Sequence, residues 1–131
     1  MGIDTRDVEA FAARLRGAPD RLAAEAKRVT SRGALNIKVE AQRRVRDATS
    51  GPGRTHLPHY PRAITYNVRT GRDWVRADIG PETARLQGGM GRGVEFGSRR
   101  TPPIPHLFPA LDGEEPAYVR YLLDAAEGAL R

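Results

Sequence analysis

The sequence predicts an α+β fold, in which a long N-terminal helix and a C-terminal helix pack on a small antiparallel β-sheet of three to four strands. Two patterns lead to this prediction. Apolar residues recur every three or four positions in the first and last parts of the chain, whereas apolar and polar residues alternate in its middle. The length of 131 residues suits one hydrophobic core, so we expect residues 1–131 to form a single domain.

The N-terminal part predicts a short helix followed by a long one. Asp4 is the predicted N-cap of the short helix, and Asp7 is an acidic residue in its first turn. An apolar stripe follows at Val8, Phe11, Ala12 and Leu15. Gly17 and Pro19 predict the end of this helix. A second helix of about 30 residues then follows, which is long for a compact domain. Its predicted buried face contains Leu22, Ala26, Val29, Gly33, Ile37, Ala41, Val45 and Ala48.

The middle of the chain predicts a loop and then a β-hairpin. Residues 50–62 contain several Pro and Gly residues and predict an irregular loop. Residues 64–69 and 74–79 alternate apolar and polar side chains on either side of a turn at 70–73, which predicts two antiparallel strands.

The segment after the hairpin predicts mostly extended chain. We expect a glycine-rich loop over residues 82–93, with one helical turn at 82–86, and a third short strand at 94–96. Four Pro residues predict extended chain over 99–109. Pro116 is expected to begin the last helix, whose predicted buried residues are Val119, Leu122, Leu123, Ala126 and Leu130.

Composition favours an oligomer. Leu, Ile, Val and Phe together number only 26, so a single copy has few large side chains for its core. The net charge of +6 is unevenly spread, because residues 111–131 carry two basic and five acidic side chains whereas the rest of the chain is basic. A basic body and an acidic tail suit head-to-tail contact between copies, although solvated charged faces are the alternative interpretation.

Several function classes are not expected from this composition. The chain has no Cys, which excludes disulfides, thiolate zinc sites and cysteine nucleophiles. No apolar run approaches the roughly 20 residues that span a bilayer, and no signal-peptide pattern is visible, so we expect a soluble protein made in the cytoplasm with no membrane partner.

The candidate chemical motifs do not predict an enzyme or a metal site. His56 and His59 lack a third nearby ligand, and His106 is interpreted as a packing or hydrogen-bonding residue. The glycine-rich run at 88–93 lacks the Gly-Lys-Ser/Thr ending of a phosphate-binding loop. No nucleophile–base pair or pair of carboxylates can be assembled, so we expect no catalysis, no cofactor and no bound metal.

The basic charge raises the possibility of nucleic-acid binding. Trp74 lies beside Arg72 and Arg76 in the predicted hairpin, but no helix-turn-helix, zinc-finger or aromatic stacking motif accompanies them. Sequence-specific binding is therefore not expected, and weak binding through charge stays open as an alternative.

Two segments near the C-terminus resemble a known family. Residues 93–98 read Gly-Val-Glu-Phe-Gly-Ser, and residues 105–112 read Pro-His-Leu-Phe-Pro-Ala-Leu-Asp. Together they resemble the small tail-completion, or neck, proteins of long-tailed phages. In that family a Glu-Phe-Gly-Thr/Ser strand precedes a Pro-x-x-Pro-Phe-Leu-x-Pro-Ala-Leu motif, and this motif leads into the last helix. The motif and interface positions are Val94, Glu95, Phe96, Gly97, Pro105, Leu107, Phe108, Pro109, Ala110 and Leu111.

This chain departs from the family pattern at one place. His106, Leu107 and Phe108 stand where Pro-Phe-Leu is usual, which displaces the aromatic residue. Because Pro residues stiffen the segment, its apolar side chains become anchors on a rigid strap. We expect Phe108 to pack within its own domain and part of the linker at 99–105 to contact a neighbouring subunit.

The resemblance implies a structural virion protein without catalytic activity. It implies a ring, sixfold as in phage tails, that completes the tail or joins it to the head and is assembled in the host cytoplasm. The implied partners are other copies of the chain, the neighbouring stopper, terminator or tube proteins, and genomic DNA that passes through the lumen without sequence-specific contact. The alternatives are a tail terminator that caps the tube and, from another class, a basic DNA-binding accessory protein.

Overall fold

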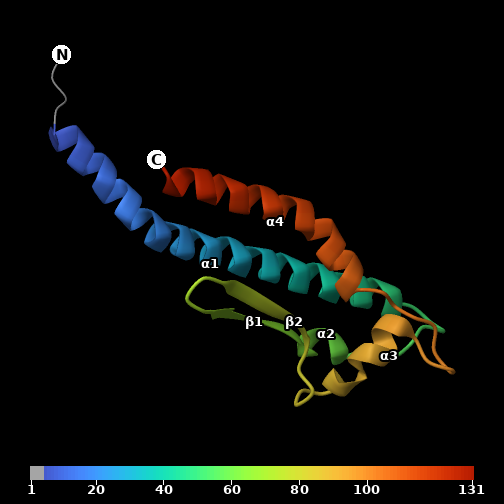
Figure 1. The fold of residues 1–131 in the computed structure, drawn as a ribbon. Helices are drawn as coiled ribbons and strands as arrows, with labels where there is room; N and C mark the ends of the chain where they lie inside the picture. The colour runs from blue at the N-terminus through green and yellow to red at the C-terminus, as the bar shows by residue number, and fades with distance from the viewer. Residues whose placement is uncertain (1–4) are drawn as a thin grey trace.

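The computed structural model describes residues 5–131, so the predicted cap Asp4 lies outside the described residues. The fold is α+β, with two long helices and an antiparallel β-hairpin, as the sequence predicts (Figure 1). Helix α1 (Thr5–Thr49) lies in the middle, with helix α4 (Leu107–Ala129) along one side and the hairpin along the other. No helix within residues 5–131 is long and apolar enough to cross a bilayer.

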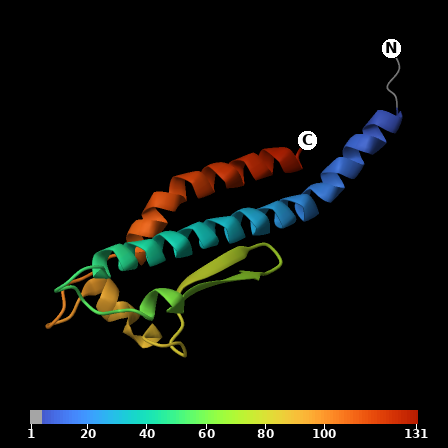
Figure 2. The same ribbon diagram turned by 180° about the vertical axis from the view of Figure 1, so that it is seen from behind.

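Helix α1 is continuous where the sequence predicts two helices. Pro19 lies inside it rather than at a break. A proline in a helix interior removes one backbone hydrogen bond and bends the helix, and Figures 1 and 2 show α1 bending in its N-terminal part. The predicted buried face is confirmed at Val29, Gly33, Ile37, Ala41 and Val45, whereas Leu22 is 37% exposed.

The β-hairpin is confirmed. Strand β1 (Ile64–Thr70) pairs with β2 (Val75–Pro81), from Ile64 opposite Pro81 to Thr70 opposite Val75. The turn is closed by a bond of 2.9 Å from the Gly71 N–H to the Trp74 carbonyl. The sheet of the described chain has these two strands, which is fewer than the three to four predicted.

The predicted third strand is wrong. Residues 88–96 form a 3-10 turn, η1 (Gly88–Met90), followed by the short helix α3 (Gly91–Phe96). The strand interpretation required Val94 and Phe96 to share one face and Glu95 to point to the other. In the structure Val94 and Glu95 are buried together, and Phe96 is 63% exposed.

The last helix begins earlier than predicted. Helix α4 starts at Leu107 rather than at Pro116, which lies inside the helix where Figures 1 and 2 show it bend. Its face against α1 contains the small residues Ala125 and Ala129. Three of the residues predicted to be buried are therefore exposed, namely Val119, Leu123 and Leu130, while Leu122 and Ala126 are half-buried.

The hydrophobic core lies where α1, the hairpin and the loop segments meet. A single-turn helix, α2 (Tyr60–Ala63), ends the loop over residues 50–59 and places Tyr60 in this core with no exposed surface. The core residues are Ile37, Ala41, Val45, Leu57, Tyr60, Ile64, Val94 and Ala110, with Ile79, Ile104 and Leu107 packed against them. Helices α1 and α4 run in opposite directions. Two hydrogen bonds show this: the Asn36 side chain donates to Glu114 at 3.0 Å, and the Arg21 side chain donates to the Ala129 carbonyl at 2.7 Å.

Candidate functional site

The two halves of the sequence motif meet at the N-terminus of α4. Glu95, on α3, is 5% exposed, and its carboxylate accepts the backbone N–H groups of His106 at 2.7 Å, Leu107 at 3.0 Å and Phe108 at 3.0 Å. His106 is the N-cap residue of α4, and its own side chain makes no capping bond. Glu95 therefore caps a helix that begins about a dozen residues further along the chain.

Proline completes this cap. The first turn of a helix exposes N–H groups that have no partner within the helix. Pro109 has no N–H, and the first bond within α4 runs from the Ala110 N–H to the His106 carbonyl at 3.2 Å. Glu95 and Pro109 thus leave no N–H of this turn without a partner.

Burial and hydrogen bonding act in opposite directions on Glu95. Burial raises the pKa of the Glu95 carboxyl, but the three N–H bonds and the neighbouring His106 ring outweigh it and hold the pKa below its usual value. The carboxylate is therefore charged at neutral pH. A negative charge at a helix N-terminus also interacts favourably with the helix dipole.

His106 and Tyr60 extend the network into the core. His106 Nδ1 lies 2.7 Å from Glu95 Oε2 and 2.8 Å from the Ile104 carbonyl, and Nε2 lies 2.8 Å from the Tyr60 hydroxyl. Burial, together with the Glu95 charge, raises the pKa of Tyr60, so its hydroxyl keeps its proton. The two neighbours of Nδ1, a carboxylate oxygen and a carbonyl oxygen, can only accept, so Nδ1 carries a proton and donates to them. Nε2 and the Tyr60 hydroxyl share a second hydrogen bond.

This network is suited to holding segments together. Within residues 5–131, no buried side-chain polar atom lacks a hydrogen-bond partner. Tyr60, Glu95 and His106 come from three separate segments, and a fully satisfied buried network fixes their arrangement. Sequence reasoning interpreted His106 correctly as a hydrogen-bonding residue but did not identify Tyr60, whose position before Pro61 gave no chemical signal.

The remaining motif residues separate into inward and outward groups. Val94 and Ala110 are buried in the core, and Leu107 is half-buried against it. Gly97 has a φ of +79°, and a Cβ at this position would lie 2.8 Å from the Pro103 nitrogen, so a glycine is required. The outward group is Phe96, Pro105, Phe108 and Leu111, all exposed, while Pro109 is half-buried.

Phe108 does not pack inside its own domain, contrary to the expectation from the sequence. Its side chain is 56% exposed, and its ring centroid lies 5.8 Å from that of Phe96, which is also exposed. Because α4 already begins at Leu107, Phe108 lies in the first turn and projects away from the face that Ala110 buries. The two rings form an exposed aromatic pair beside the capped helix end, and such an exposed apolar patch is typical of a contact surface.

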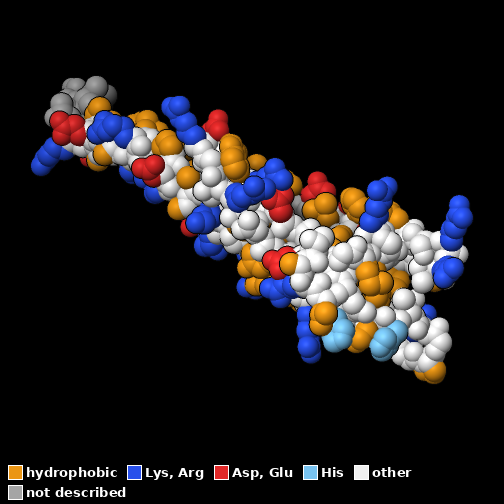
Figure 3. Space-filling model, turned by 90° about the horizontal axis from the view of Figure 1, so that it is seen from below, with side chains coloured by type: hydrophobic (Ala, Val, Ile, Leu, Met, Phe, Trp, Pro, Cys, Tyr) orange, Lys and Arg blue, Asp and Glu red, His pale blue; other side chains and the backbone are white. Residues whose placement is uncertain are grey.

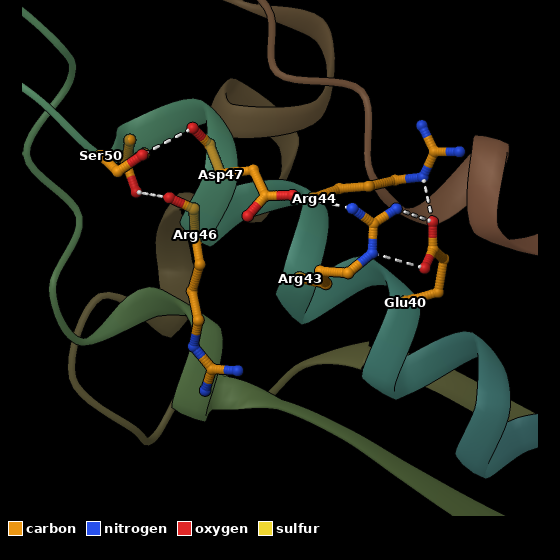
Figure 4. Close-up of polar contacts among 7 residues, drawn as sticks. Glu40, Arg43, Arg44, Arg46, Asp47 and Ser50 are labelled. Atoms are coloured by element: carbon orange, nitrogen blue, oxygen red, sulfur yellow. Dashed lines mark hydrogen bonds and ion pairs between the residues drawn. The ribbon is translucent and has the colours of Figure 1, made fainter.

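Basic side chains at this end of the molecule are only partly neutralised. Figure 4 shows Arg43 and Arg44 bonded to Glu40 near the end of α1, and Arg43 also pairs with Asp47 at 2.7 Å. The hydrogen bond from Arg43 lowers the pKa of Glu40. Arg46 points away from this group (Figure 4).

Three further arginines lie in the loops that follow α1 and α3. Arg54, Arg99 and Arg100 are exposed, and among the ion pairs of residues 5–131 none includes them. In the hairpin, by contrast, Arg76 pairs with Asp78 at 2.8 Å. The loops therefore offer unpaired cations. Of the predicted basic group around Trp74, Arg76 is paired, whereas Arg72 is exposed and is in none of the ion pairs of residues 5–131.

The predicted absence of a metal site rested on His56 and His59. Both are exposed, and the described residues contain no group of three or more His, Asp or Glu side chains placed to hold an ion. His59 contributes its backbone N–H, which bonds to the Gln87 side chain at 2.8 Å.

Comparison of the chain with known protein families, curated protein sequences and solved structures finds no match.

Proposed function

We propose that this chain is a structural protein of the head–tail junction of a long-tailed phage. In this role it forms a ring, sixfold as the tail symmetry implies, that completes the tail or joins it to the head, with no catalytic step and no cofactor. It works in the virion, after assembly in the host cytoplasm.

The observation that carries the proposal is the bond between the two motif halves. The Glu-Phe-Gly segment and the Pro-Ala-Leu segment are separate in sequence, yet Glu95 of the first caps the helix that begins in the second. This arrangement supplies a physical reason for both segments to occur together, as they do in the family that the chain resembles. It also holds the Phe96 and Phe108 rings rigidly at the surface, where they can contact a neighbour.

The charge distribution supports assembly. Helix α4 carries five acidic side chains and one arginine, whereas α1 is strongly basic. Opposite charge on different faces of one subunit favours contact between unlike faces of neighbouring copies. The exposed aromatic pair and the acidic helix can then serve contacts with other copies and with the adjacent stopper, terminator or tube proteins.

The proposal is tested by a virion reconstruction from the phage whose genome encodes this chain. The expected result is ring-shaped density, fitted by this fold, between the head and the tail tube. Density at the end of the tube, in place of the neck, would assign the chain to tail termination. If the chain is missing from the purified particle, the structural role is wrong.

A second candidate function, from another class, is DNA binding. It is favoured by Arg54, Arg99 and Arg100, which are exposed and unpaired among the described residues. Contacts from such arginines to phosphates are independent of sequence and weaken steeply with salt. In the neck, the same cations could face the genomic DNA that passes through the lumen, so DNA binding in solution alone does not exclude the structural role.

A further inference from the structure

The first turns of α1 carry an apolar face that the rest of the described chain leaves open. Figures 1 and 2 show this part of α1, here called the N-terminal arm (residues 5–22), extending past the C-terminal end of α4. Val8, Phe11 and Leu15 on the arm are 54%, 52% and 44% exposed. In the space-filling view of Figure 3, apolar side chains reach the surface beside basic ones at this end of the molecule.

These side chains follow the spacing of a helix–helix contact. Val8, Phe11, Leu15, Ala18 and Leu22 are separated alternately by three and four residues, which places them on one side of the helix. Ala18 is the only buried member of this series, with 8% exposure. The arm therefore presents a seam about 21 Å long, at a rise of about 1.5 Å per residue, for which residues 5–131 provide no complete partner.

Helix α4 carries a second seam of the same kind. Its buried residues Ala125 and Ala129 face α1, but Val119, Leu123 and Leu130 lie on another side and are 47%, 62% and 65% exposed. With the half-buried Ala126 they follow a four–three–four spacing. These four residues are here called the outer face of α4. A helix with two apolar faces requires a partner on each of them.

We infer that the N-terminal arm of one copy packs on the outer face of α4 of a neighbouring copy. The inference deepens the proposed function and rests on it for its biological setting. Three pairings of the two seams are conceivable: arm with arm, α4 with α4, and arm with α4.

Charge distinguishes these pairings. The arm carries four basic and three acidic side chains, a net charge of +1, whereas α4 carries one basic and five acidic ones, a net charge of −4. On the arm, the Arg14 guanidinium lies 5.9 Å from the centroid of the exposed Phe11 ring. Beside the outer face of α4, the 71% exposed Glu127 forms a long ion pair of 3.9 Å with Arg131. Pairing like helices brings like charges together, whereas the arm and α4 attract each other.

The contact joins two different surfaces, so each copy keeps a free arm or a free outer face until the assembly closes. A head-to-tail contact of this kind builds a ring when the rotation between copies closes, and a filament when it does not. If the rotation closes, this one contact suffices for the ring of the proposed function, and no further interface is needed.

Disulfide cross-linking tests the contact directly, because the chain contains no cysteine of its own. Leu15→Cys is mixed in turn with Val119→Cys, Leu123→Cys and Leu130→Cys, and each mixture of purified proteins is oxidised at high protein concentration. The substituted side chains are exposed, so the fold is expected to persist. We expect at least one mixture to give a cross-linked dimer, and neither protein alone to do so.

The matched control replaces the arm variant by Leu86→Cys, which is 70% exposed and lies on neither seam. A contact that holds two thiols together gives them an effective concentration in the millimolar range, so the arm–α4 product should exceed the control by more than about tenfold. A Leu15→Cys dimer formed by that protein alone would show arm–arm pairing and overturn the inference. Equal yields from the control mixture would overturn it as well.

Charge and localisation give two independent measurements. Sedimentation should show that Leu15→Asp lowers self-association of the chain, whereas Leu86→Asp leaves self-association unchanged. The purified-protein cross-link does not depend on the virion: a specific cross-link from a chain that is absent from phage particles would refute the proposed function and keep this contact. A chain that is found in the neck but gives only control-level cross-links would support the proposed function and refute this contact.

Discussion

The Glu95 carboxylate accepts the backbone N–H of Phe108 at 3.0 Å, and this bond ties α3 to the first turn of α4. The same carboxylate holds the N–H groups of His106 and Leu107. Since the aromatic pair of Phe96 and Phe108 spans these two helices, Glu95 controls whether the exposed rings keep their relative position. A buried side chain thereby determines the shape of a surface.

The first prediction concerns the stability that this cap provides. Replacing Glu95 by Gln removes the charge and one of the two acceptor oxygens, so it should lower the free energy of unfolding by about 2–3 kcal/mol, because hydrogen bonds to charged groups are worth about 1.5–3 kcal/mol. Urea denaturation followed by circular dichroism measures this change. Glu115→Gln, at an exposed position of α4, is the matched control and should change stability by less than about 0.5 kcal/mol. Equal effects of the two substitutions would contradict the capping role.

The second prediction is the pH dependence of the same carboxylate. Its pKa in the folded protein lies below the ordinary value of 4.5, so its contribution to stability is complete above that value and is lost as the pH falls through the folded pKa. The difference in unfolding free energy between the natural protein and Glu95→Gln should therefore be constant near neutral pH and narrow in acid. Other ion-paired carboxylates, such as Asp78 and Glu82, also stabilise the fold less in acid. Because they are present in both proteins, their contributions to the unfolding free energy cancel in the difference. A difference that stays unchanged or widens in acid would show that Glu95 is not charged in the fold.

Patterns of hydrophobicity predicted the elements whose two faces differ in environment. The hairpin and the stretch of α1 from Val29 to Val45 follow their periodicity closely, because each has one face against the core. The periodicity of α4 also indicated an apolar face, but the face predicted to be buried is largely the exposed one. Small residues such as Ala125 let α4 approach α1 closely, and the larger Leu123 is left outside.

Three proline residues caused the errors at the helix boundaries. Pro19, Pro109 and Pro116 were interpreted as helix boundaries or extended chain, yet all three lie inside helices. Pro109 is tolerated because an N–H group in the first turn of a helix has no acceptor within that helix, so its absence costs no hydrogen bond. The cap from Glu95 is a contact between distant segments, and no local pattern indicates that a carboxylate on α3 satisfies the N–H groups of α4.

The third prediction concerns Gly97, which ends α3 with a φ of +79°. Gly97→Ala should destabilise the fold by roughly 1–3 kcal/mol, because the backbone strain is joined by a Cβ only 2.8 Å from the Pro103 nitrogen. Gly113→Ala is the matched control, since a Cβ in that helical position meets nothing within 4 Å. It should stabilise α4 by up to about 1 kcal/mol. Thermal unfolding of the two variants should thus shift in opposite directions, and a shift in the same direction would disprove the argument.

The last prediction separates assembly from DNA binding. Phe108 is 56% exposed, so Phe108→Ala should cost about 0.5–1.5 kcal/mol at most, the value of its contact with the Phe96 ring, and leave the fold intact. If Phe108 contacts a neighbouring subunit, this variant should nevertheless lower the yield of infectious particles in a complementation assay. Leu86→Ala, at a more exposed apolar position away from α4, is the control and should give the natural yield.

The opposing variant removes three exposed cations of the loops, which are in no ion pair of residues 5–131, by changing Arg54, Arg99 and Arg100 to Ala together. For a structural protein, this change should reduce non-specific DNA binding, with a salt dependence lower by about 0.9 log units per lost phosphate contact, while the particle yield stays close to natural. A DNA-binding accessory protein should behave in the opposite way, because its function depends on the cations and not on an exposed phenylalanine. Normal yield with Phe108→Ala, together with no particles from a triple arginine variant whose circular dichroism and thermal unfolding match those of the natural protein, would therefore refute the structural role.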